Sequence, residues 1–178
     1  MASGNLLIET ERLLLRRYEQ KDLQDLYEYV SDPEVVKFEP YQPMTLEETR
    51  ENLDWRISTD EMIAVEEKSC HKMIGNVYLG KREFDAIEIG YVFHRNYWGH
   101  GYAKESCNAL IQKAFAEGIH RIYAECDPLN AASWHLLESM GFEREAHFRQ
   151  NVFFWKDEKG RPVWKDTYVY ARLCDPCR

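Results

Sequence analysis

The chain has 178 residues and a formal net charge of −8, and 44% of its residues are hydrophobic and 13% aromatic. This length and composition predict one domain with a substantial core and exclude a disordered tail protein. The acidic balance, without any run of Lys and Arg, disfavours nucleic acid as a partner. A cationic amine substrate is compatible with it.

No apolar run reaches the roughly 20 residues that a membrane span needs, and residues 1–5 lack the features of a secretory signal. The five cysteines are too sparse for a disulfide scaffold. The pair Cys174 and Cys177 is interpreted as part of an unstructured C-terminal tail. We therefore expect a cytoplasmic protein with no contact to membranes.

The first part of the chain predicts a strand, a helix and a loop. Residues 6–18 read as one strand, and residues 21–30 place apolar side chains on one helical face before a Pro ends the helix. The segment 35–43 is predicted to be an irregular loop. Its aromatic residues Phe38 and Tyr41 either cover a small core or form the wall of a substrate pocket.

The remaining elements follow from capping residues and periodicity. Thr45 and Glu48 have the spacing of a capping box, which predicts a helix to about Ile57. Asn130 is a good N-cap for a later helix. The other predicted elements are strands at 62–66, 73–81, 86–94 and 121–126, helices at 101–117 and 131–140, and a hairpin formed by 146–155 and 163–173. The order predicts a single mixed α/β domain.

The stretch from Asn96 to Ala103, between a strand and a helix, carries Gly99 and Gly101. Backbone N–H groups at a helix start have no intrahelical partner, and the helix dipole adds positive potential there. Glycines let a bulky group approach the backbone closely. A tight turn is the alternative explanation, and the dinucleotide fingerprint does not fit because its third glycine falls on Lys104. We expect a phosphate-bearing ligand at residues 97–103.

Three blocks of the sequence resemble the GNAT N-acetyltransferases, and within them the RimJ/RimL-type branch, which acetylates protein N-termini and other small amines. The blocks are Glu9–Arg16, Ile89–Tyr91 with Tyr97–Glu105, and Asn130–Ser133 with Met140–Phe142. The resemblance covers residues 9–173, between an N-terminal extension (1–8) and a C-terminal tail (174–178). It implies one GNAT-like domain with a central mixed, largely antiparallel twisted sheet flanked by about four helices.

The resemblance implies acetyl-CoA as the cosubstrate. Its pantetheine arm is expected to pair with the backbone of Val92, Phe93 and His94 like an added strand. Asn130, besides capping its helix, and Ser133 are expected near the thioester. The pyrophosphate is expected on the backbone of Trp98, Gly99, His100, Gly101, Tyr102 and Ala103. The family's pyrophosphate motif begins with Gln or Arg, where this chain has Asn96. We expect no metal, because the six histidines form no metal-binding motif.

Acetyl transfer to an amine needs a proton acceptor, stabilisation of the thioester oxygen and departure of the CoA thiolate. Glu125 has the glutamate-to-asparagine spacing of the N-terminal acetyltransferases that the chain resembles. Glu88 lies in the strand where other branches carry a base acting through water. Each is alternatively a solvated or ion-paired strand residue.

The sequence offers several candidates for protonating the leaving group. The family's usual general acid is a tyrosine, and that position holds Leu137 here. Ser133 matches a serine of the RimJ/RimL branch and is expected to hydrogen-bond the leaving sulfur, although it could also satisfy local backbone groups. Tyr168 and Tyr170 are alternative acids.

These residues predict direct acetyl transfer to a primary amine, at a protein or peptide N-terminus or a similar group. One alternative is a small-amine acetyltransferase acting on a polyamine, an amino acid or an amine antibiotic. The other is a CoA-binding sensor that kept the fold and lost catalysis, which the absent tyrosine favours. The loop 35–43 is expected to shape the acceptor pocket. A homodimer is compatible with this interpretation.

Overall fold

The structure, a computed structural model, describes residues 6–174. Its strands are β1 (Leu6–Glu9), β2 (Leu13–Arg16), β3 (Met62–Glu67), β4 (Lys72–Arg82), β5 (Ala86–Phe93), β6 (Arg121–Cys126), β7 (Glu143–Val152) and β8 (Lys165–Leu173). Its helices are α1 (Leu23–Val30), α2 (Leu46–Ser58), α3 (Tyr102–Ala116) and α4 (Ala131–Ser139), with short 3₁₀ turns η1 (Gln20–Asp22) and η2 (Arg95–Tyr97).

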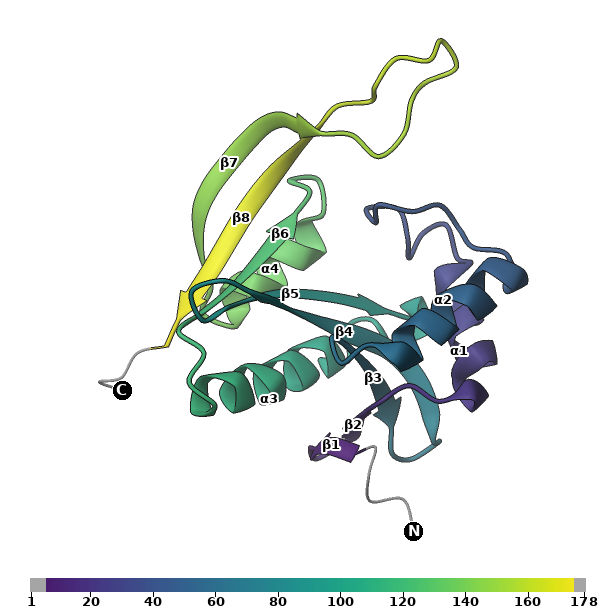
Figure 1. The fold of residues 1–178 in the computed structure, drawn as a ribbon, viewed down its shortest axis with the longest axis vertical. Helices are drawn as coiled ribbons and strands as arrows, with labels where there is room; N and C mark the ends of the chain where they lie inside the picture. Colours follow the sequence, from purple (N-terminus) through teal and green to yellow (C-terminus); the bar gives the residue numbers. More distant parts are fainter. Residues whose placement is uncertain (1–5, 175–178) are drawn as a thin grey trace.

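The strands form one sheet in the order β1-β2-β3-β4-β5-β6-β8-β7 (Figure 1). Neighbouring strands are antiparallel, except that β5 and β6 are parallel. The α3 helix is the crossover between these two parallel strands, as such a connection requires. The predicted single domain with a mixed, largely antiparallel sheet and four helices is confirmed.

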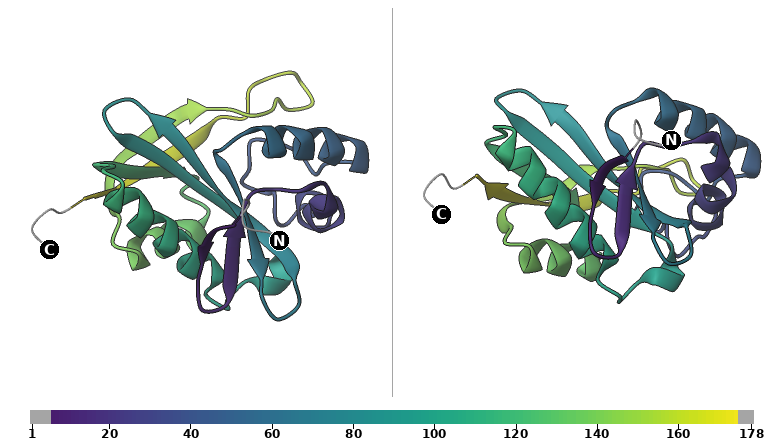
Figure 2. Two further views of the ribbon diagram at one scale, coloured as in Figure 1. Left: turned by 60° about the horizontal axis from the view of Figure 1, so that its bottom comes forward. Right: turned by 90° about the horizontal axis from the view of Figure 1, so that it is seen from below.

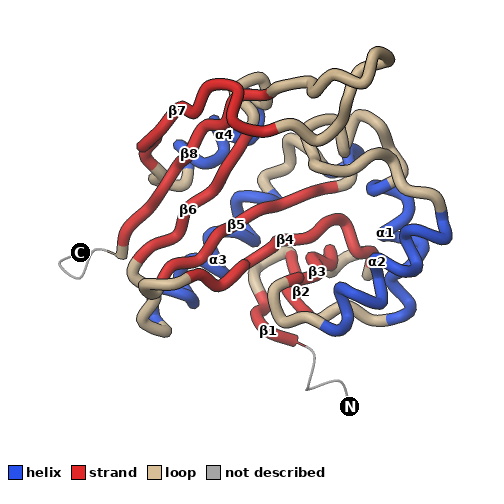
Figure 3. Tube along the Cα trace, turned by 45° about the horizontal axis from the view of Figure 1, so that its top comes forward, coloured by secondary structure: helices blue, strands red, loops and turns tan. Residues whose placement is uncertain are grey.

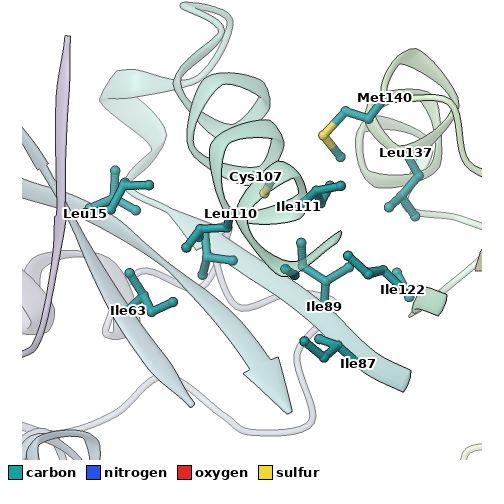
Figure 4. Packing of buried hydrophobic residues seen from close by; sticks show 14 of the residues in the cluster. Leu15, Ile63, Ile87, Ile89, Cys107, Leu110, Ile111, Ile122, Leu137 and Met140 are labelled. Atoms are coloured by element: carbon teal, nitrogen blue, oxygen red, sulfur yellow. The ribbon is translucent and has the colours of Figure 1, made fainter. Parts of the chain in front are cut away.

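Helices cover both faces of the sheet (Figure 2). The larger core lies under α3 and α4, where side chains such as Ile89, Ile111 and Leu137 pack together (Figure 4). A smaller core lies on the opposite face, where α1 and α2 cover β3 and β4 through residues such as Leu26 and Leu53. Because side chains alternate along a strand, the residues of β5 between the core positions face the α1–α2 side.

Local capping explains the helix boundaries. The Thr45 hydroxyl accepts a hydrogen bond from the Glu48 N–H (3.3 Å), and the Glu48 carboxylate accepts one from the Thr45 N–H (2.7 Å). The capping box predicted for α2 is therefore confirmed. Gly118 and Gly141, just beyond the ends of α3 and α4, have φ values of 94° and 81°, which an L side chain adopts only with strain.

The prediction of one strand over residues 6–18 is wrong. Residues 10–12 form a turn, so that β1 and β2 pair as an antiparallel hairpin. The Thr10 hydroxyl accepts a hydrogen bond from the Leu13 N–H (3.0 Å) and closes the turn within an otherwise apolar run. The sheet also begins at Leu6, inside the segment expected to be an N-terminal extension. Residues 175–178 of the predicted tail, Cys177 among them, lie outside the described residues.

Candidate active site

The site is built where β5 and β6 separate. The two strands pair only over Ala86–Glu88 and Arg121–Tyr123. β5 continues along β4 to Phe93, and β6 continues along β8 to Cys126, so their facing edges diverge (Figure 3). A cavity of about 1230 Å³ opens at this divergence. Its walls are β5, β6, parts of α2, β3 and β4, the starts of α3 and α4, the loop between α1 and α2, and the end of the β7–β8 hairpin.

The free edge of β5 can pair with an extended ligand. Backbone N–H and C=O groups at an open strand edge need partners, and an added strand supplies them. Val92 and Phe93 line the cavity as expected, whereas His94 is not among its lining residues. The His94 N–H already donates to the carbonyl of Ile74 (2.9 Å), and the Phe93 carbonyl accepts from the Trp98 indole (2.8 Å). The structure therefore does not support the expected role of the His94 backbone.

The glycine loop has the geometry of an anion site. Gly99 and Gly101 have φ values of 77° and 80°, in the left-handed region that favours glycine. The Glu105 N–H donates to the Gly101 carbonyl (3.0 Å), so the N–H groups of residues 102–104 start α3 without an intrahelical partner. The cavity is lined here by Trp98, Gly99, Gly101, Tyr102 and Ala103. His100 lies outside the lining, and its ring stacks on that of Tyr102.

An ion pair fixes this loop to the N-terminal hairpin. The Arg12 guanidinium donates to the Glu105 carboxylate from Nε (2.7 Å) and to the His100 carbonyl from Nη1 (2.9 Å). The Thr10 hydroxyl also donates to Glu105 (2.7 Å). The sequence alone indicated no role for Thr10, Arg12 or Glu105, although all three fall in the blocks that carried the resemblance. Their proximity depends on the pairing of the hairpin with the sheet, which residue spacing does not reveal.

Glu125 and Glu88 lie on the same face of the sheet and both line the cavity. Glu88 forms an ion pair with Arg82 (2.6 Å). The Glu125 carboxylate forms neither an ion pair nor a hydrogen bond within residues 6–174, and its pKa is raised, first by burial and then by the nearby charge of Glu88. Of the two, Glu125 is therefore the carboxylate left available to accept a proton.

Asn130 and Ser133 lie at the start of α4 and line the cavity. The Asn130 side-chain oxygen accepts a hydrogen bond from the Ser133 N–H (3.2 Å), which confirms Asn130 as the helix cap. The Tyr91 hydroxyl donates to the Ser133 carbonyl (3.0 Å) and lies 3.1 Å from the Ser133 hydroxyl oxygen. Burial raises the pKa of Tyr91. Nothing in the sequence pattern indicates this chemical role for Tyr91.

The other tyrosines considered as acids lie elsewhere. Neither Tyr168 nor Tyr170 is among the lining residues, and the Tyr170 hydroxyl donates to Glu138 (2.9 Å). Leu137, which stands at the position of the family's usual tyrosine, is fully buried in the larger core (Figure 4). Its side chain packs rather than contributing to the chemistry.

The wall toward α1 and α2 contains the two predicted pocket residues, Phe38 and Tyr41. It also contains Glu39 and Arg56, which the sequence analysis did not select. Arg56 is spaced like any charged residue on a helix, and only the tertiary fold shows that it is buried. Within residues 6–174, no three His, Cys, Asp or Glu side chains gather as metal ligands would, and no helix is long and apolar enough to span a membrane.

Comparisons with known proteins identify the family. Residues 12–143 match the family model described as an acetyltransferase (GNAT) domain. The chain is 34% identical to the Bacillus subtilis protein named "Uncharacterized N-acetyltransferase YnaD", over 93% of this chain and 96% of that one. It is 32% identical to the similarly named p20 of Bacillus licheniformis, over 92% and 94% of the two chains.

A solved structure agrees with these sequence matches. A GNAT-family acetyltransferase from Bacillus anthracis has 33% identity and a TM-score of 0.85, and the match covers 93% of this chain and 97% of that one. The chain belongs to the GNAT family. It is an acetyl-CoA-dependent N-acetyltransferase of this type, with a cavity at the divergence of its two parallel strands.

Proposed function

We propose that this protein transfers the acetyl group of acetyl-CoA directly to the α-amino group of a peptide or protein N-terminus, as in the RimJ/RimL branch. The observation that carries the proposal is Glu125, a carboxylate that lines the cavity, has no ion-pair or hydrogen-bond partner among residues 6–174, and has a raised pKa. A free α-amino group has a pKa near 8, within reach of a carboxylate base, whereas a lysine amine, near 10.4, needs more help.

The fold occurs both in an enzyme named for a protein substrate and in one named for a polyamine. A structure titled ribosomal-protein-S5-alanine acetyltransferase, from Vibrio fischeri, has a TM-score of 0.76 at 23% identity. A spermidine N-acetyltransferase from Vibrio cholerae also has a TM-score of 0.76, at 21% identity. At these identities the likeness concerns the fold alone, so the choice between peptide and polyamine rests on the residues of the cavity.

In the proposed reaction, acetyl-CoA lies in the gap between β5 and β6. The N–H groups of residues 102–104 hold the diphosphate, and the free edge of β5 up to Val92 pairs with the pantetheine arm. Glu125 accepts the proton of the amine, either directly or through a water molecule. The amine then attacks the thioester carbon, the C–S bond breaks, and the CoA thiolate leaves. The second proton of the attacking nitrogen passes to the departing sulfur or to solvent, so that the products are the amide and the CoA thiol.

We assign hydrogen bonding of the leaving sulfur to the Ser133 hydroxyl, and the positioning of that hydroxyl to Tyr91, whose own proton is donated to the Ser133 carbonyl and whose hydroxyl oxygen lies 3.1 Å from that of Ser133. This pair supplies a hydroxyl donor although Leu137 replaces the usual tyrosine, and so weakens the argument for a sensor. We expect Tyr91→Phe, which keeps the ring, to lower kcat by about tenfold, less than the full effect of a general acid. The affinity for acetyl-CoA should not change. An unaltered kcat in Tyr91→Phe would show that the Tyr91 hydroxyl takes no part in the reaction.

An assay that detects free CoA thiol tests the function with three groups of acceptors: peptides with a free α-amino group, polyamines, and aminoglycosides. Turnover of peptides above the other two groups supports the proposal. Preferential turnover of polyamines or aminoglycosides indicates the small-amine alternative. Binding of acetyl-CoA, measured by calorimetry, without turnover of any amine indicates a sensor.

A further inference from the structure

The part of the cavity lining formed by α2, β4 and the loop between α1 and α2 is called the acceptor wall below, because the acceptor is expected there. Arg56, on the last turn of α2, is a buried cation in this wall. The residue is 4% exposed. Its Nε donates to Asn52 (2.6 Å) and its Nη1 to the Tyr18 hydroxyl (2.9 Å), and both acceptors are neutral. The guanidinium forms no ion pair with any carboxylate of residues 6–174.

The other buried arginine shows how unusual this is. Arg16, 7% exposed, bonds two carboxylates, those of Asp22 and Glu66, each at 2.7 Å. A buried charge normally has such a counter-charge because removal from water is costly. The carbonyl end of α2 compensates the Arg56 charge only in part, since a helix terminus carries about half an elementary charge. Much of the positive charge of Arg56 is therefore not compensated by the protein and can interact with a ligand.

The nearest acid is a poor counter-ion. Glu39, on the loop between α1 and α2, is close enough to Arg56 for their charges to interact, but the two do not form an ion pair. Burial raises the pKa of Glu39 to about 7 in spite of the arginine. At neutral pH this carboxyl is neutral in a large part of the molecules, so it leaves the charge of Arg56 incompletely balanced.

A second residue with a donor group, Asn76, lines the same cavity. The Tyr29 hydroxyl donates to the side-chain oxygen of Asn76 (2.8 Å), and the Tyr18 and Tyr29 hydroxyl oxygens lie 3.3 Å apart. The side-chain oxygen of Asn76 is thus already hydrogen-bonded to this chain of hydroxyl groups. The residue Asn76 is 3% exposed and lines the cavity. Its amide nitrogen donates to no atom within residues 6–174. Arg56 and Asn76 thus offer donors to a ligand in this wall, and neither forms an ion pair with a carboxylate of residues 6–174.

The position of these donors limits the ligand. Asn76 is on β4, opposite Val92 of β5, and Glu125 is on β6. Neighbouring strands lie about 4.8 Å apart, so two spacings separate Asn76 from the base Glu125 by about 10 Å, and the divergence of β5 and β6 adds to this. Arg56 is linked to Asn76 through the hydroxyl groups of Tyr18 and Tyr29. The carboxylate of a free α-amino acid is one carbon away from its amine and does not span this distance.

We propose that the acceptor carries a carboxylate that binds Arg56 and Asn76, several bonds away from the amine that is acetylated at Glu125. The inference rests on the function proposed above and narrows it to acidic peptides. An extended peptide advances about 3.4 Å per residue, so a Glu side chain at the second or third residue reaches the donors. A polyamine, with further positive charges in place of the carboxylate, would be repelled by Arg56.

The test compares peptides that differ only in this group. Each has a free α-amino group and an amidated C-terminus, with Glu, Gln or Lys at residues 2 and 3. For the wild-type enzyme we expect kcat/KM to be about tenfold higher with Glu than with Gln, the scale of a hydrogen bond to a charged group. The difference should lie mainly in KM, because the carboxylate is bound equally in the ground and transition states.

Variants assign the preference to the site. Arg56→Met should bring the Glu/Gln ratio close to one by slowing the Glu peptide, while the Gln peptide stays within about twofold. Arg50→Met is the matched control, because Arg50 is on the same helix, outside the cavity lining, with a side chain 55% exposed. It should leave the ratio unchanged. Thermal unfolding and acetyl-CoA binding report whether each variant folds.

The outcomes separate the inference from the function on which it rests. Equal kcat/KM for the Glu and Gln peptides in the wild-type enzyme overturns the carboxylate site and leaves N-terminal acetylation standing. A preference that survives in a folded Arg56→Met also overturns it. Should Arg56→Met not fold, Asn76→Asp, which places a negative charge in the same wall, must slow the Glu peptide selectively or the site is wrong. Absence of turnover with every amine overturns the proposed function and the inference with it.

Discussion

Glu125 and Glu88 lie on the same face of the sheet, line the same cavity and yet differ in partners. Arg82 forms an ion pair with Glu88 at 2.6 Å, whereas Glu125 has no such partner in the described part of the chain and a raised pKa. A carboxylate that is hard to ionise binds a proton more strongly, so the unpaired residue is the better base and the paired one contributes its charge. The fold thus distinguishes two residues that the sequence left as alternatives.

We expect Glu125→Gln to lower kcat/KM by about 100-fold near pH 7, the lower end of what a positioned base contributes. The wild-type enzyme loses activity toward low pH as both the amine and Glu125 become protonated. Because the pKa of Glu125 is raised, its protonation occurs at higher pH than for an ordinary Glu. The variant keeps only the titration of the amine, so its acid limb should be less steep.

The control for this substitution is Glu88→Gln. It should change kcat/KM by a smaller factor, because Arg82 already holds Glu88 as an ion pair. The measurement is a pH profile of kcat/KM with one peptide for the wild type and both variants. An acid limb of unchanged slope in Glu125→Gln would move the base to Glu88 or to solvent.

At the scale of elements, the N-terminal hairpin and the start of α3 act as one unit. Arg12 bonds Glu105 and the His100 carbonyl, and the Thr10 hydroxyl adds a further bond to Glu105. The pKa of Glu105 is lowered by these hydrogen bonds in spite of its burial. Glu105 is thus a fixed negative charge beside a loop expected to bind a diphosphate, and it is tolerable there because Arg12 neutralises it.

We expect Arg12→Met to weaken acetyl-CoA binding by about tenfold or more, because the unpaired Glu105 then repels the diphosphate across a few ångströms. Arg12→Met combined with Glu105→Gln should recover part of the affinity, since it removes the repulsion as well as the ion pair. Calorimetric titration of acetyl-CoA at low and high salt measures both variants. An equal loss in the single and double variants would show that Arg12 acts by shaping the loop and not by neutralising Glu105.

Gly101 begins α3 with a φ of 80°, and a Cβ added there has room in the protein, with the nearest atom, of Arg12, at 3.5 Å. We expect Gly101→Val to lower acetyl-CoA affinity by more than about tenfold, because the branched side chain occupies the space beside the N–H groups of α3 that an anion would need. Gly160→Val is the control for strain, as Gly160 has a φ of 74° and open space around it. Both substitutions should lower the Tm, but only Gly101→Val should lower the affinity for acetyl-CoA. Equal acetyl-CoA affinities of the two variants would show that the diphosphate does not bind at this loop.

Local chemistry made most of the elements predictable. The capping pair Thr45 and Glu48, the cap Asn130 and the periodic faces of α3 gave correct helices because each signal acts within a few residues. The hairpin turn at residues 10–12 was missed because a threonine hydroxyl closes it inside an apolar run. For the site, Glu125 was accessible to reasoning from spacing. Tyr91 and Arg56 were not, because their roles depend on which distant segments the sheet and α2 bring together.

At the scale of the molecule, three segments meet beside the acceptor wall of the cavity. Lys165 of β8 forms an ion pair with Asp127, beyond β6, at 2.8 Å, and both side chains are largely buried. The same ammonium lies over the ring of Phe38, at 5.8 Å from its centre, and over that of Trp155, at 5.3 Å. One cation thus connects the α1–α2 loop, the β6–α4 connection and the β7–β8 hairpin around the cavity.

We expect Lys165→Met to raise KM for the peptide acceptor several-fold while the affinity for acetyl-CoA stays the same. The variant loses the ion pair, leaves the largely buried Asp127 carboxylate without its counter-charge and removes the cation from both aromatic rings, whose contacts contribute about 0.5–2 kcal/mol each. Hydrogen exchange should increase in residues 35–43 and 153–164 and stay constant in α3. Lys113→Met, on an exposed pair with Glu117 of α3, is the matched control and should change neither quantity. Unchanged exchange and unchanged KM in Lys165→Met would mean that the loops hold their positions without this cation, and that the acceptor is bound by the sheet and α2 alone.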